Sequence, residues 1–436
     1  MEYVHIHSDF SNGGLGFRDS TNSIKALVAR HKELGCSAVM LTDHACVSGH
    51  VELEMQCNKA GLKAIYGSEI YLTREDLDNT NFERGERFYH FLLMAKNRKG
   101  WAQLNELTTM AHKRSFVSAV KRVPNYMSDL ARVINAGGQN LVATSACLGG
   151  LFNPLIQEWH RTRDENIKNE IINRIQCFNQ LFGHGNFYLE IQPALYEEQQ
   201  IYNSWLGVFG QATGTPLIVG VDAHYLNKDD FNVHKAYLNS QEGKARETED
   251  FYKYTYLMLE DEVRENLAQC SGLTDDMINN AILNTEALVA GCEEFSISSP
   301  IRVPRTELPS QQTWSQAAYK YIEFPIVKAF VESENAIDRF FISQVMSGFE
   351  KYVAKGVLAP HNVERICDEL QTVWDVGVKI NDNLGGYFTT LQRILDVIWK
   401  LSIVGAGRGS AGGFLINFVM DITQVNPLDY DLPAWR

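Results

Sequence analysis

Two pairs of polar residues share a spacing that suits the binding of a metal ion. His5 and His7 form an HxH pair in the segment YVHIH, and Asp222 and His224 repeat this spacing in VDAHY. In an extended strand, residues two positions apart face the same side. Both side chains of a pair can therefore reach one cation, and imidazole and carboxylate groups are common ligands of zinc and related ions.

Other ionisable residues lie where apolar segments end. Asp43 and His44 close VMLTDH, Glu69 lies in YGSEIYL, His90 in FYHFLL and Cys147 in ATSACLGG. A single buried histidine is more often a core residue than a ligand. Here, however, five of the twelve histidines, together with carboxylates and a cysteine, lie at or near the predicted C-terminal ends of successive strands, the end of a parallel barrel where active sites are built. A metal cluster gives a simple reason to gather so many ionisable groups.

The segments that carry these residues alternate between strands and helices. Apolar residues at helical spacing predict a helix over Asn22–Leu34, and a second helix is expected over Val51–Ala60. The alternation continues over about 230 residues, which predicts an α/β fold with a parallel sheet, closed or nearly closed into a barrel. Thr73–Arg87 is expected to be an insertion loop. The predicted strands are YVHIH, SAVMLTDH, KAIYGSEIYL, FYHFLLMA, NLVATSAC, NFYLEIQP and PLIVGVDAHY.

After about Ser240 the alternation stops. Leu273–Ile297 is predicted to be a helix that a Thr-Asp-Asp cap opens. The segment SSPIRVPRTELPS, with three prolines, is expected to be a linker or domain boundary. Gln311–Val378 is expected to be mostly helical.

Composition narrows the class of protein. The chain has 436 residues, of which 45% are hydrophobic and 21% charged, and this balance is ordinary for a globular protein of two or three domains. The sequence contains no run of about 18 apolar residues, so no membrane span is predicted. The N-terminus lacks a signal-peptide pattern, and the eight cysteines include no CxxC pair, so a cytoplasmic location is expected. The net charge of −13 argues against a general basic coat for nucleic acid but allows a local basic groove.

A glycine-rich stretch, GAGRGSAGGF, covers residues 405–414. Glycines let a backbone approach a phosphate and expose its N–H groups, and Arg408 and Ser410 can donate hydrogen bonds to phosphate oxygens. The stretch follows LDVIWKLSIV, which resembles a strand, and precedes FLINFVMDI, a predicted helix whose N-terminus would add a favourable dipole. It matches neither a GxGxxG nor a Walker A motif, so a purely structural turn is the alternative.

The motifs HIHSDFS, LTDHACVSGH, GSEIYL, FYHFLLMAKNRKG, ATSACLGG and VDAHYL resemble those of the PHP (polymerase and histidinol phosphatase) domain. More narrowly, they resemble the N-terminal domain of the bacterial replicative DNA polymerase III alpha subunits, the C family. The resemblance implies a distorted (β/α)7 barrel over residues 1–240 that holds three divalent ions, zinc or manganese. The ligands it implies are His5, His7, Asp19, His44, Glu69, His90, Cys147, Asp222 and His224.

The same resemblance implies a metal-dependent 3′–5′ exonuclease or phosphoesterase, with Glu69, Asp222 and His224 in catalytic roles and Glu69 as the carboxylate that bridges two ions. A thiolate at Cys147 would favour zinc. Asp19, in RDS, fits a longer version of the family's loop, and its alternative role is to cap the following helix.

The C-terminal part carries a second resemblance. GGYF, the glycine-rich stretch and DITQVNPLDYDLPAWR are similar to the start of the C-family polymerase palm. This implies that Arg408, Gly409, Ser410 and Arg436 contact the triphosphate of an incoming dNTP. Residues 301–436 would form part of an α+β palm after a helical extension over 241–300. In the family, the aspartates that bind the catalytic Mg²⁺ lie beyond the position of Arg436, so polymerisation is expected to need a second chain.

Three hypotheses follow from these patterns. The first is part of a replicative DNA polymerase, with an active PHP nuclease, DNA and dNTP as partners and no membrane association. The second is a self-standing PHP phosphoesterase that acts on small phosphate esters or nucleic-acid ends. The third is a non-catalytic scaffold for a polymerase partner.

Overall fold

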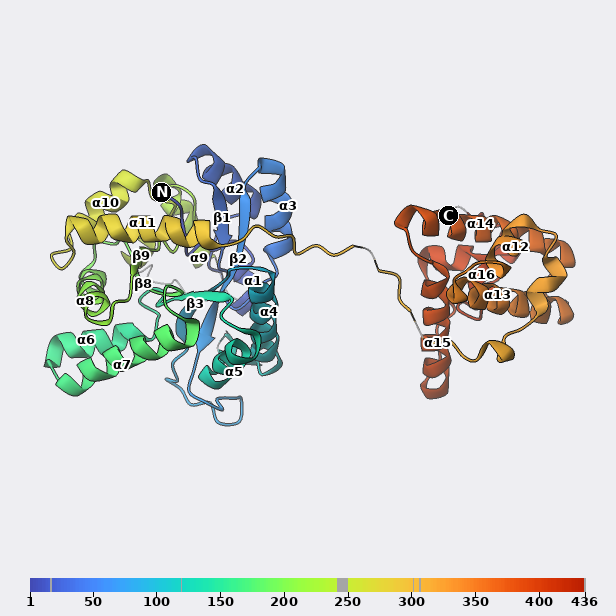
Figure 1. The fold of residues 1–436 in the computed structure, drawn as a ribbon, viewed down its shortest axis with the longest axis horizontal. Coiled ribbons are helices and arrows are strands. Elements are labelled where there is room, and N and C mark those ends of the chain that lie inside the picture. The colour runs from blue at the N-terminus through green and yellow to red at the C-terminus, as the bar shows by residue number, and fades with distance from the viewer. Residues whose placement is uncertain (16–17, 119, 241–249, 301, 306, 435–436) are drawn as a thin grey trace. The chain divides into compact units, whose positions relative to one another are not determined.

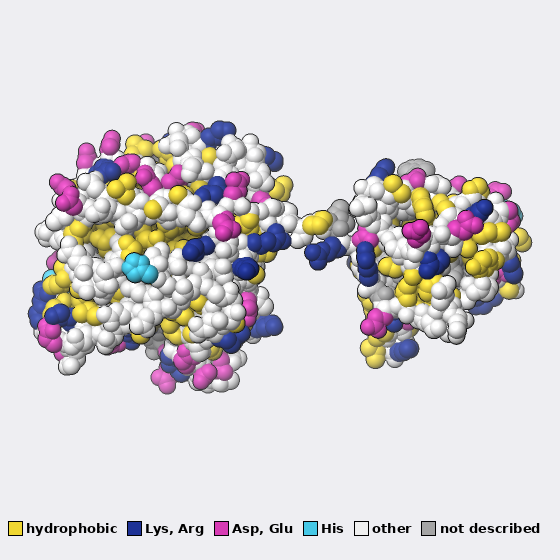
Figure 2. Space-filling view, viewed as in Figure 1, with side chains coloured by type: hydrophobic (Ala, Val, Ile, Leu, Met, Phe, Trp, Pro, Cys, Tyr) yellow, Lys and Arg dark blue, Asp and Glu magenta, His cyan; other side chains and the backbone are white. Residues whose placement is uncertain are grey.

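The computed structural model describes residues 1–15, 18–118, 120–240, 250–300, 302–305 and 307–434 (Figure 1). These residues form two compact units, Met1–Ser298 and Ser299–Arg436, each with its own hydrophobic core. Across the described ranges, no helix is both long enough and apolar enough to cross a membrane. On the face shown in Figure 2, acidic and basic side chains are mixed on both units.

The first unit is an α/β structure around one curled sheet of seven strands, and the predicted fold class is confirmed (Figure 1). The order is β1-β2-β3-β7-β8-β9, and β6 pairs with β2 outside this path. A separate hairpin joins β4 (Phe116–Val117) to β5 (Lys121–Arg122). The strands of the main sheet are β1 (Ala38–Leu41), β2 (Lys63–Leu72), β3 (Tyr89–Ala95), β6 (Pro124–Asn125), β7 (Leu141–Thr144), β8 (Phe187–Ile191) and β9 (Leu217–Val219).

The sheet is mixed, and the expectation of an all-parallel sheet is wrong. β1 and β2 are parallel, as are β7, β8 and β9, but β3 runs antiparallel to both β2 and β7. The cause lies in the connection between β2 and β3, residues 73–88, which contains no helix. A parallel pair needs a crossover, usually through a helix, whereas a loop returns the chain in the opposite direction.

The N-terminal segment Val4–His7 lies between the two ends of the curled sheet but is not the regular strand expected of YVHIH. Its backbone bonds to Thr42 on one side, with Thr42 N to Ile6 O at 2.9 Å. On the other side, Ala223 N donates to His5 O and His7 N donates to Ala223 O, both at 3.0 Å. His5 (φ 63°) and Asp222 (φ 48°) both adopt the left-handed conformation, which interrupts a regular strand.

Helices cover the outside of the sheet, and their ends follow local capping chemistry. Ser23 caps α2, and Gly61, with φ 74°, ends α3. Thr274 caps α11 as predicted, and the Thr285 hydroxyl of α11 accepts the Val219 N–H of β9 at 2.9 Å. The helices of this unit are α1 (Ser11–Leu15), α2 (Ile24–Glu33), α3 (His50–Ala60), α4 (Arg98–Lys113), α5 (Met127–Gly137), α6 (Phe152–Thr162), α7 (Glu165–Phe182), α8 (Glu197–Thr213), α9 (Phe231–Asn239), α10 (Glu260–Ala268) and α11 (Asp275–Gly291).

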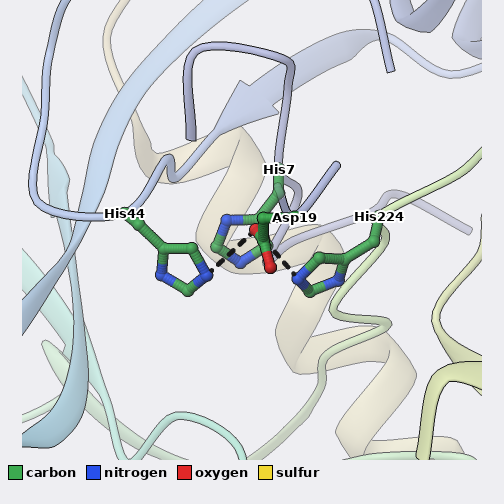
Figure 3. A group of neighbouring side chains, drawn as sticks. All are labelled: His7, Asp19, His44 and His224. Carbon is green, nitrogen blue, oxygen red and sulfur yellow. Dashed lines mark ion pairs between the residues drawn. The ribbon is translucent and has the colours of Figure 1, made fainter. Parts of the chain in front are cut away.

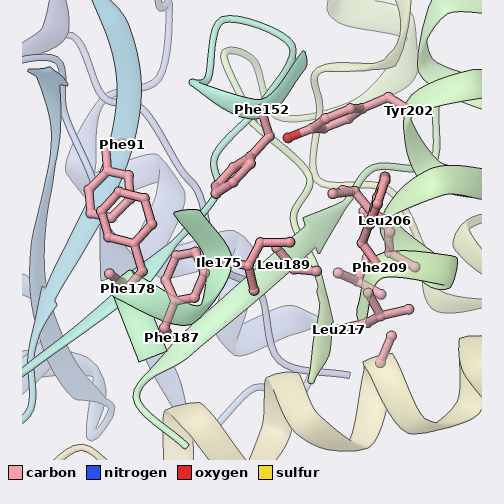
Figure 4. Close-up of a cluster of buried hydrophobic side chains, with 14 of the residues drawn as sticks. Phe91, Phe152, Ile175, Phe178, Phe187, Leu189, Tyr202, Leu206, Phe209 and Leu217 are labelled. Atoms are coloured by element: carbon pink, nitrogen blue, oxygen red, sulfur yellow. The ribbon is translucent and has the colours of Figure 1, made fainter. Parts of the chain in front are cut away.

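Aromatic rings fill the core between the sheet and the helices α6 and α7 (Figure 4). The Phe178 ring lies 4.9 Å from that of Phe91 on β3 and 5.1 Å from that of Phe187 on β8, centroid to centroid. Phe152 contacts both Phe178 and Phe187. Burying these large side chains on both strands fixes β3 and β8 against one helix layer, which holds the polar ends of the strands in place.

The second unit consists of helices and loops, with no strand among residues 302–305 and 307–434. The interpretation of LDVIWKLSIV as strand-like is wrong, because its first residues belong to a helix that ends at Leu401. Phe388, Leu391 and Leu395 recur at helical spacing and pack on the core of this unit, which decides the conformation. The helices are α12 (Pro325–Val331), α13 (Ala336–Ala354), α14 (Val363–Ile380), α15 (Gly385–Leu401) and α16 (Leu415–Val419).

A pH dependence of stability follows from one buried histidine of α2. His31 is fully buried and donates from Nδ1 to Leu27 O at 2.8 Å, and burial lowers its pKa to about 4. Folding therefore favours the neutral ring, so its contribution is complete above the unfolded pKa of about 6.5 and is lost as pH falls toward 4. Replacing it with glutamine should reduce the loss of unfolding free energy between pH 7 and pH 4 by about 3 kcal/mol.

Urea unfolding at the two pH values measures this difference. His184→Gln, at an exposed position, is the control and should keep the pH dependence of the unmodified protein. An unchanged pH dependence in His31→Gln would contradict the assignment.

Candidate metal centre

The nine side chains predicted to bind metal come together at one mouth of the sheet. Their ligand atoms form three groups, and within each group all of these atoms lie within 4.8 Å of one another. The groups are His7, Asp19, His44 and His224; His5, His7 and Asp222; and Glu69, His90 and Cys147. Eight of the nine are buried and His90 is half-buried.

The strand directions explain why these residues meet. His44, Cys147 and Asp222 follow the C-terminal ends of β1, β7 and β9, as expected of a parallel barrel. His90 instead stands near the N-terminal end of β3, directly opposite Tyr71 of β2. Because β3 is antiparallel to its neighbours, its beginning lies at the same mouth as their ends.

The first group surrounds the Asp19 carboxylate (Figure 3). Asp19 Oδ2 lies 3.1 Å from His44 Nε2 and 3.3 Å from His224 Nε2. The His7 ring lies against both of these histidines, at centroid distances of 4.2 and 4.5 Å. The alternative role of Asp19 as a helix cap is excluded, because Ser23 caps α2.

Glu69 contacts members of all three groups. Its Oε1 lies 2.9 Å from His90 Nδ1 and 3.4 Å from His5 Nε2, and its Oε2 lies 2.7 Å from His44 Nδ1. Cys147 Sγ lies 3.4 Å from His90 Nδ1. A carboxylate in this position can bridge two cations, one on each oxygen.

The electrostatics of the mouth reflect dense packing of opposite charges. Burial opposes the charged form of Glu69, yet His90, His44 and His5 hold its pKa well below the usual value. Burial opposes the charge on Asp19 as well, but His224 and His44 lower its pKa well below the usual range. Burial and the neighbouring His44 and His224 lower the pKa of His7 to about 3, so this ring is neutral and able to ligate at ordinary pH.

The thiol of Cys147 behaves differently. Burial, Asp222 and Glu69 raise its pKa well above the ordinary value. A thiolate in these surroundings therefore requires a cation within reach, since a bound divalent ion deprotonates a coordinating thiol.

Unsatisfied polar atoms test whether these residues fit metal ions. Four buried atoms of the cluster make no regular hydrogen bond and meet only other candidate ligand atoms: His5 Nε2, His7 Nε2, Asp19 Oδ2 and Glu69 Oε2. Each such atom costs roughly 1–3 kcal/mol unless something satisfies it. Imidazole, carboxylate and thiol donors at this spacing suit zinc, and the carboxylates also suit manganese. The residues fit divalent cations.

A cavity of about 270 Å³ connects the cluster with solvent. Asp19, His44, His90, Cys147, Asp222 and His224 contribute to its wall. The lining also contains two basic residues, Lys121 and Arg122 of β5, one acidic residue, Glu86, and two valines, Val120 and Val123. Four aromatic residues complete it, namely Tyr71, Phe88, Phe251 and Tyr252. The Arg122 guanidinium lies over the Phe88 ring, 4.9 Å from its centroid. An anionic substrate could thus enter along basic and aromatic side chains.

Sequence reasoning missed the residues behind the ligands. Glu190, the second-last residue of β8, is fully buried and contacts His5 Nδ1 at 2.5 Å. The one signal was a charged residue inside the otherwise buried strand FYLEI. Asp43 lies two residues after β1, next to His44, but is absent from all three ligand groups, and it accepts hydrogen bonds from Ser8 and Ser11 instead.

The glycine-rich stretch has the backbone conformations that glycine allows. Gly407 (φ 125°) and Gly409 (φ 58°) are in the left-handed region, while Arg408 and Ser410 are exposed. The N-terminus of the following helix, expected to add a favourable dipole for a phosphate, already has a partner in the structure. Glu369 occupies the N–H groups at the start of α16, since its oxygens accept from residues 415 and 416, both at 2.8 Å. Arg436 lies outside the described residues.

Comparison with known families agrees with this geometry. Residues 4–194 match the PHP domain. Residues 339–436 match the family described as bacterial DNA polymerase III alpha NTPase domain. The chain therefore combines a PHP domain with a domain of bacterial DNA polymerase III alpha subunits.

Individual relatives point the same way. The chain is 32% identical over 460 residues to the probable DNA polymerase YorL of Bacillus subtilis strain 168, a match that covers 99% of this chain and 35% of that protein. It is 27% identical over 441 residues to DNA polymerase III subunit alpha of Borreliella burgdorferi, covering 99% of this chain and 33% of that protein. The chain thus spans about a third of the length of these relatives.

A solved structure of a putative metal-dependent phosphoesterase from Bifidobacterium adolescentis is similar over 61% of this chain and 95% of that chain. The identity is 15% and the TM-score 0.31, so the likeness adds no weight to the family match.

Metal binding should stabilise the first unit, because it satisfies buried atoms that otherwise lack partners. An ion present at 100 times its dissociation constant adds about 2.7 kcal/mol to the free energy of unfolding. Addition of Zn²⁺ or Mn²⁺ to protein from which a chelator has removed the metal should therefore raise the unfolding temperature by several degrees in differential scanning calorimetry. Cys147→Ser should weaken Zn²⁺ binding more than Mn²⁺ binding, because it removes the soft ligand.

The matched control is Cys177→Ser, which changes an exposed cysteine on α7 and should leave both affinities intact. An unfolding temperature that neither chelator nor metal alters would contradict the centre.

Proposed function

We propose that this chain is part of a DNA polymerase III alpha-like replicative enzyme, and that its PHP domain is a metal-dependent phosphoesterase that removes nucleotides as a 3′–5′ exonuclease. The observation that carries the proposal is the convergence of nine ionisable side chains in three groups that Glu69 connects. We assign three divalent ions, zinc or manganese, to these groups. The proposed site of action is the cytoplasm, which the free cysteines and the polymerase relatives support.

Clustered divalent ions supply a water with lowered pKa and a positive clamp on the phosphodiester. The residues of this chain would hold and orient those components. Glu69 bridges ligand groups, while Asp222 and His224 lie where the cavity meets the cluster. We assign catalytic roles to these three residues. Lys121 and Arg122 on the cavity wall would offset the charge of the substrate phosphates, which an otherwise acidic chain would repel.

We propose a second role for the C-terminal unit. Arg408, Gly409 and Ser410 are exposed in a loop with left-handed glycines, and Arg408 can donate charged hydrogen bonds to a dNTP triphosphate. Arg436 is proposed as a further triphosphate contact. A second polymerase chain would supply the Mg²⁺-binding aspartates and bind DNA together with this one.

Removal of single ligands should abolish the nuclease activity without unfolding the domain. His7→Ala and Asp222→Ala each remove one ligand atom from the group formed by His5, His7 and Asp222. Degradation of 3′-end-labelled single-stranded DNA should then fall by more than about 100-fold. This bound follows because loss of an outer partner of a ligand alone typically costs about 10–100-fold. Circular dichroism checks the fold, and His184→Ala is the control at an exposed histidine.

Substrate preference separates the alternatives in the same assay. Full DNA degradation by both variants would exclude this site. Hydrolysis of p-nitrophenyl phosphate with no action on DNA would favour a self-standing phosphoesterase. A purified chain without bound metal or either activity would favour a non-catalytic scaffold.

The triphosphate role of the loop makes a separate prediction. With a second polymerase chain and Mg²⁺ present, Arg408→Ala should weaken dNTP incorporation by the roughly 1.5–3 kcal/mol of a hydrogen bond to a charged group. Primer extension at varied dNTP concentration measures this effect as a rise in KM. Lys400→Ala removes an exposed charge from α15 and should leave KM unchanged. Equal KM values for the two variants would exclude the assignment.

A further inference from the structure

A buried carboxylate stands directly behind His5. Glu190 has no exposed surface, and its Oε1 lies 2.5 Å from His5 Nδ1. The same carboxylate accepts hydrogen bonds from the Thr144 hydroxyl at 2.6 Å and from the Gln192 amide at 2.9 Å. Three partners thus fix its position, on the side of the His5 ring that faces away from the ligand groups.

The surrounding backbone leaves room for this carboxylate. A side chain at Gly220 would place its Cβ 2.1 Å from Glu190 Oε1, a distance at which both groups could not remain. Gly220 is the residue that follows β9, two positions before the ligand Asp222. The absence of a side chain at Gly220 therefore leaves space for the Glu190 carboxylate, in a buried position where an apolar side chain is more usual.

Contact with Glu190 fixes which nitrogen of His5 carries a proton. Both Glu190 oxygens receive hydrogen bonds, so the carboxylate acts as an acceptor and the imidazole donates from Nδ1. Nε2 is then the nitrogen with a free lone pair. In the structure this atom is buried without a hydrogen-bond partner and lies 3.1 Å from Asp222 Oδ1, a member of the same ligand group.

A second arrangement does the same for His7 through a hydroxyl group. Ser11 Oγ donates to Asp43 Oδ1 at 2.8 Å, and the Ser8 hydroxyl and N–H hold that carboxylate at 2.8 and 2.7 Å. Because a hydroxyl has one proton, Ser11 Oγ can only accept from His7 Nδ1, which lies 3.1 Å away. His7 Nε2 is therefore the bare nitrogen, and it too is buried without a hydrogen-bond partner.

We propose that Glu190, and Ser11 together with Asp43, are positioning residues that hold His5 and His7 as Nδ1–H tautomers and direct both Nε2 lone pairs at one cation shared with Asp222. This inference rests on the metal centre proposed above. Glu190 of β8 thus orients one histidine of the HxH pair, and Ser11 of α1, which Asp43 holds from the segment after β1, orients the other. Outer partners of this kind orient ligand rings and raise their basicity.

The test compares metal affinity in three single variants of the full chain. Glu190→Gln keeps the shape but weakens the acceptor at His5, and Ser11→Ala removes the acceptor at His7. Each should weaken the affinity of one of the three ions by about 10–100-fold. Competition with a chromophoric chelator measures Zn²⁺ affinity, and elemental analysis gives the number of bound ions.

The control is Glu54→Gln, a like change at another buried carboxylate. Glu54 accepts from Ile297 N at 3.0 Å and Ser298 Oγ at 2.8 Å and belongs to none of the ligand groups. This variant should lower the unfolding temperature and leave Zn²⁺ affinity unchanged.

A spectroscopic measurement separates orientation from simple stability. In the Zn²⁺-loaded protein with ¹⁵N-labelled histidine, Glu190→Gln should shift the Nδ1–H resonance of His5 alone, and Ser11→Ala that of His7 alone. Variants that lose stability but keep wild-type affinity and ring resonances would overturn the inference while leaving the metal centre in place. Should Glu190→Gln fail to fold, Ser11→Ala decides. A wild-type chain that binds no metal would instead refute the proposed function itself.

Discussion

The packing of so many ionisable groups into one buried mouth is the constraint on which the first unit depends. Charged groups removed from water are costly unless they are paired, and here imidazoles alternate with carboxylates at 2.7–3.5 Å. Glu69 is central because it touches histidines of every ligand group. These groups keep their positions because the aromatic core around Phe178, the curled sheet and the capped helices surround them. A single ion pair could not fix so many side chains.

Much of the fold could be predicted from local patterns. The helices α2 and α3 and the Thr274 cap of α11 follow from apolar spacing and capping residues, which act over a few positions. Strand direction could not be predicted in the same way. Whether β3 runs with or against β2 depends on the connection between them. The polar composition of residues 73–87 predicts an insertion loop but not the direction in which the chain returns.

The candidate site divides along a similar line. The convergence of the nine candidate ligands could be predicted, because imidazole, carboxylate and thiol groups at strand ends are unusual and resemble a known series of motifs. Glu190 could not be found, because its role depends on a contact with His5 across 185 positions of sequence. The start of α16 shows the opposite error: a local pattern suggested an open helix end, but Glu369 from α14 already fills it.

The left-handed backbone at His5 and Asp222 restricts how this centre could evolve. Both residues lie beside the bridge between Ile6 and Ala223 that joins the N-terminal segment to the chain after β9. Apart from glycine, asparagine, aspartate and histidine are the residues that enter this conformation most readily, while β-branched residues are strongly disfavoured. Of these, histidine and aspartate are also strong metal ligands. A change to valine or threonine at either position would therefore strain the backbone and remove a candidate ligand at the same time.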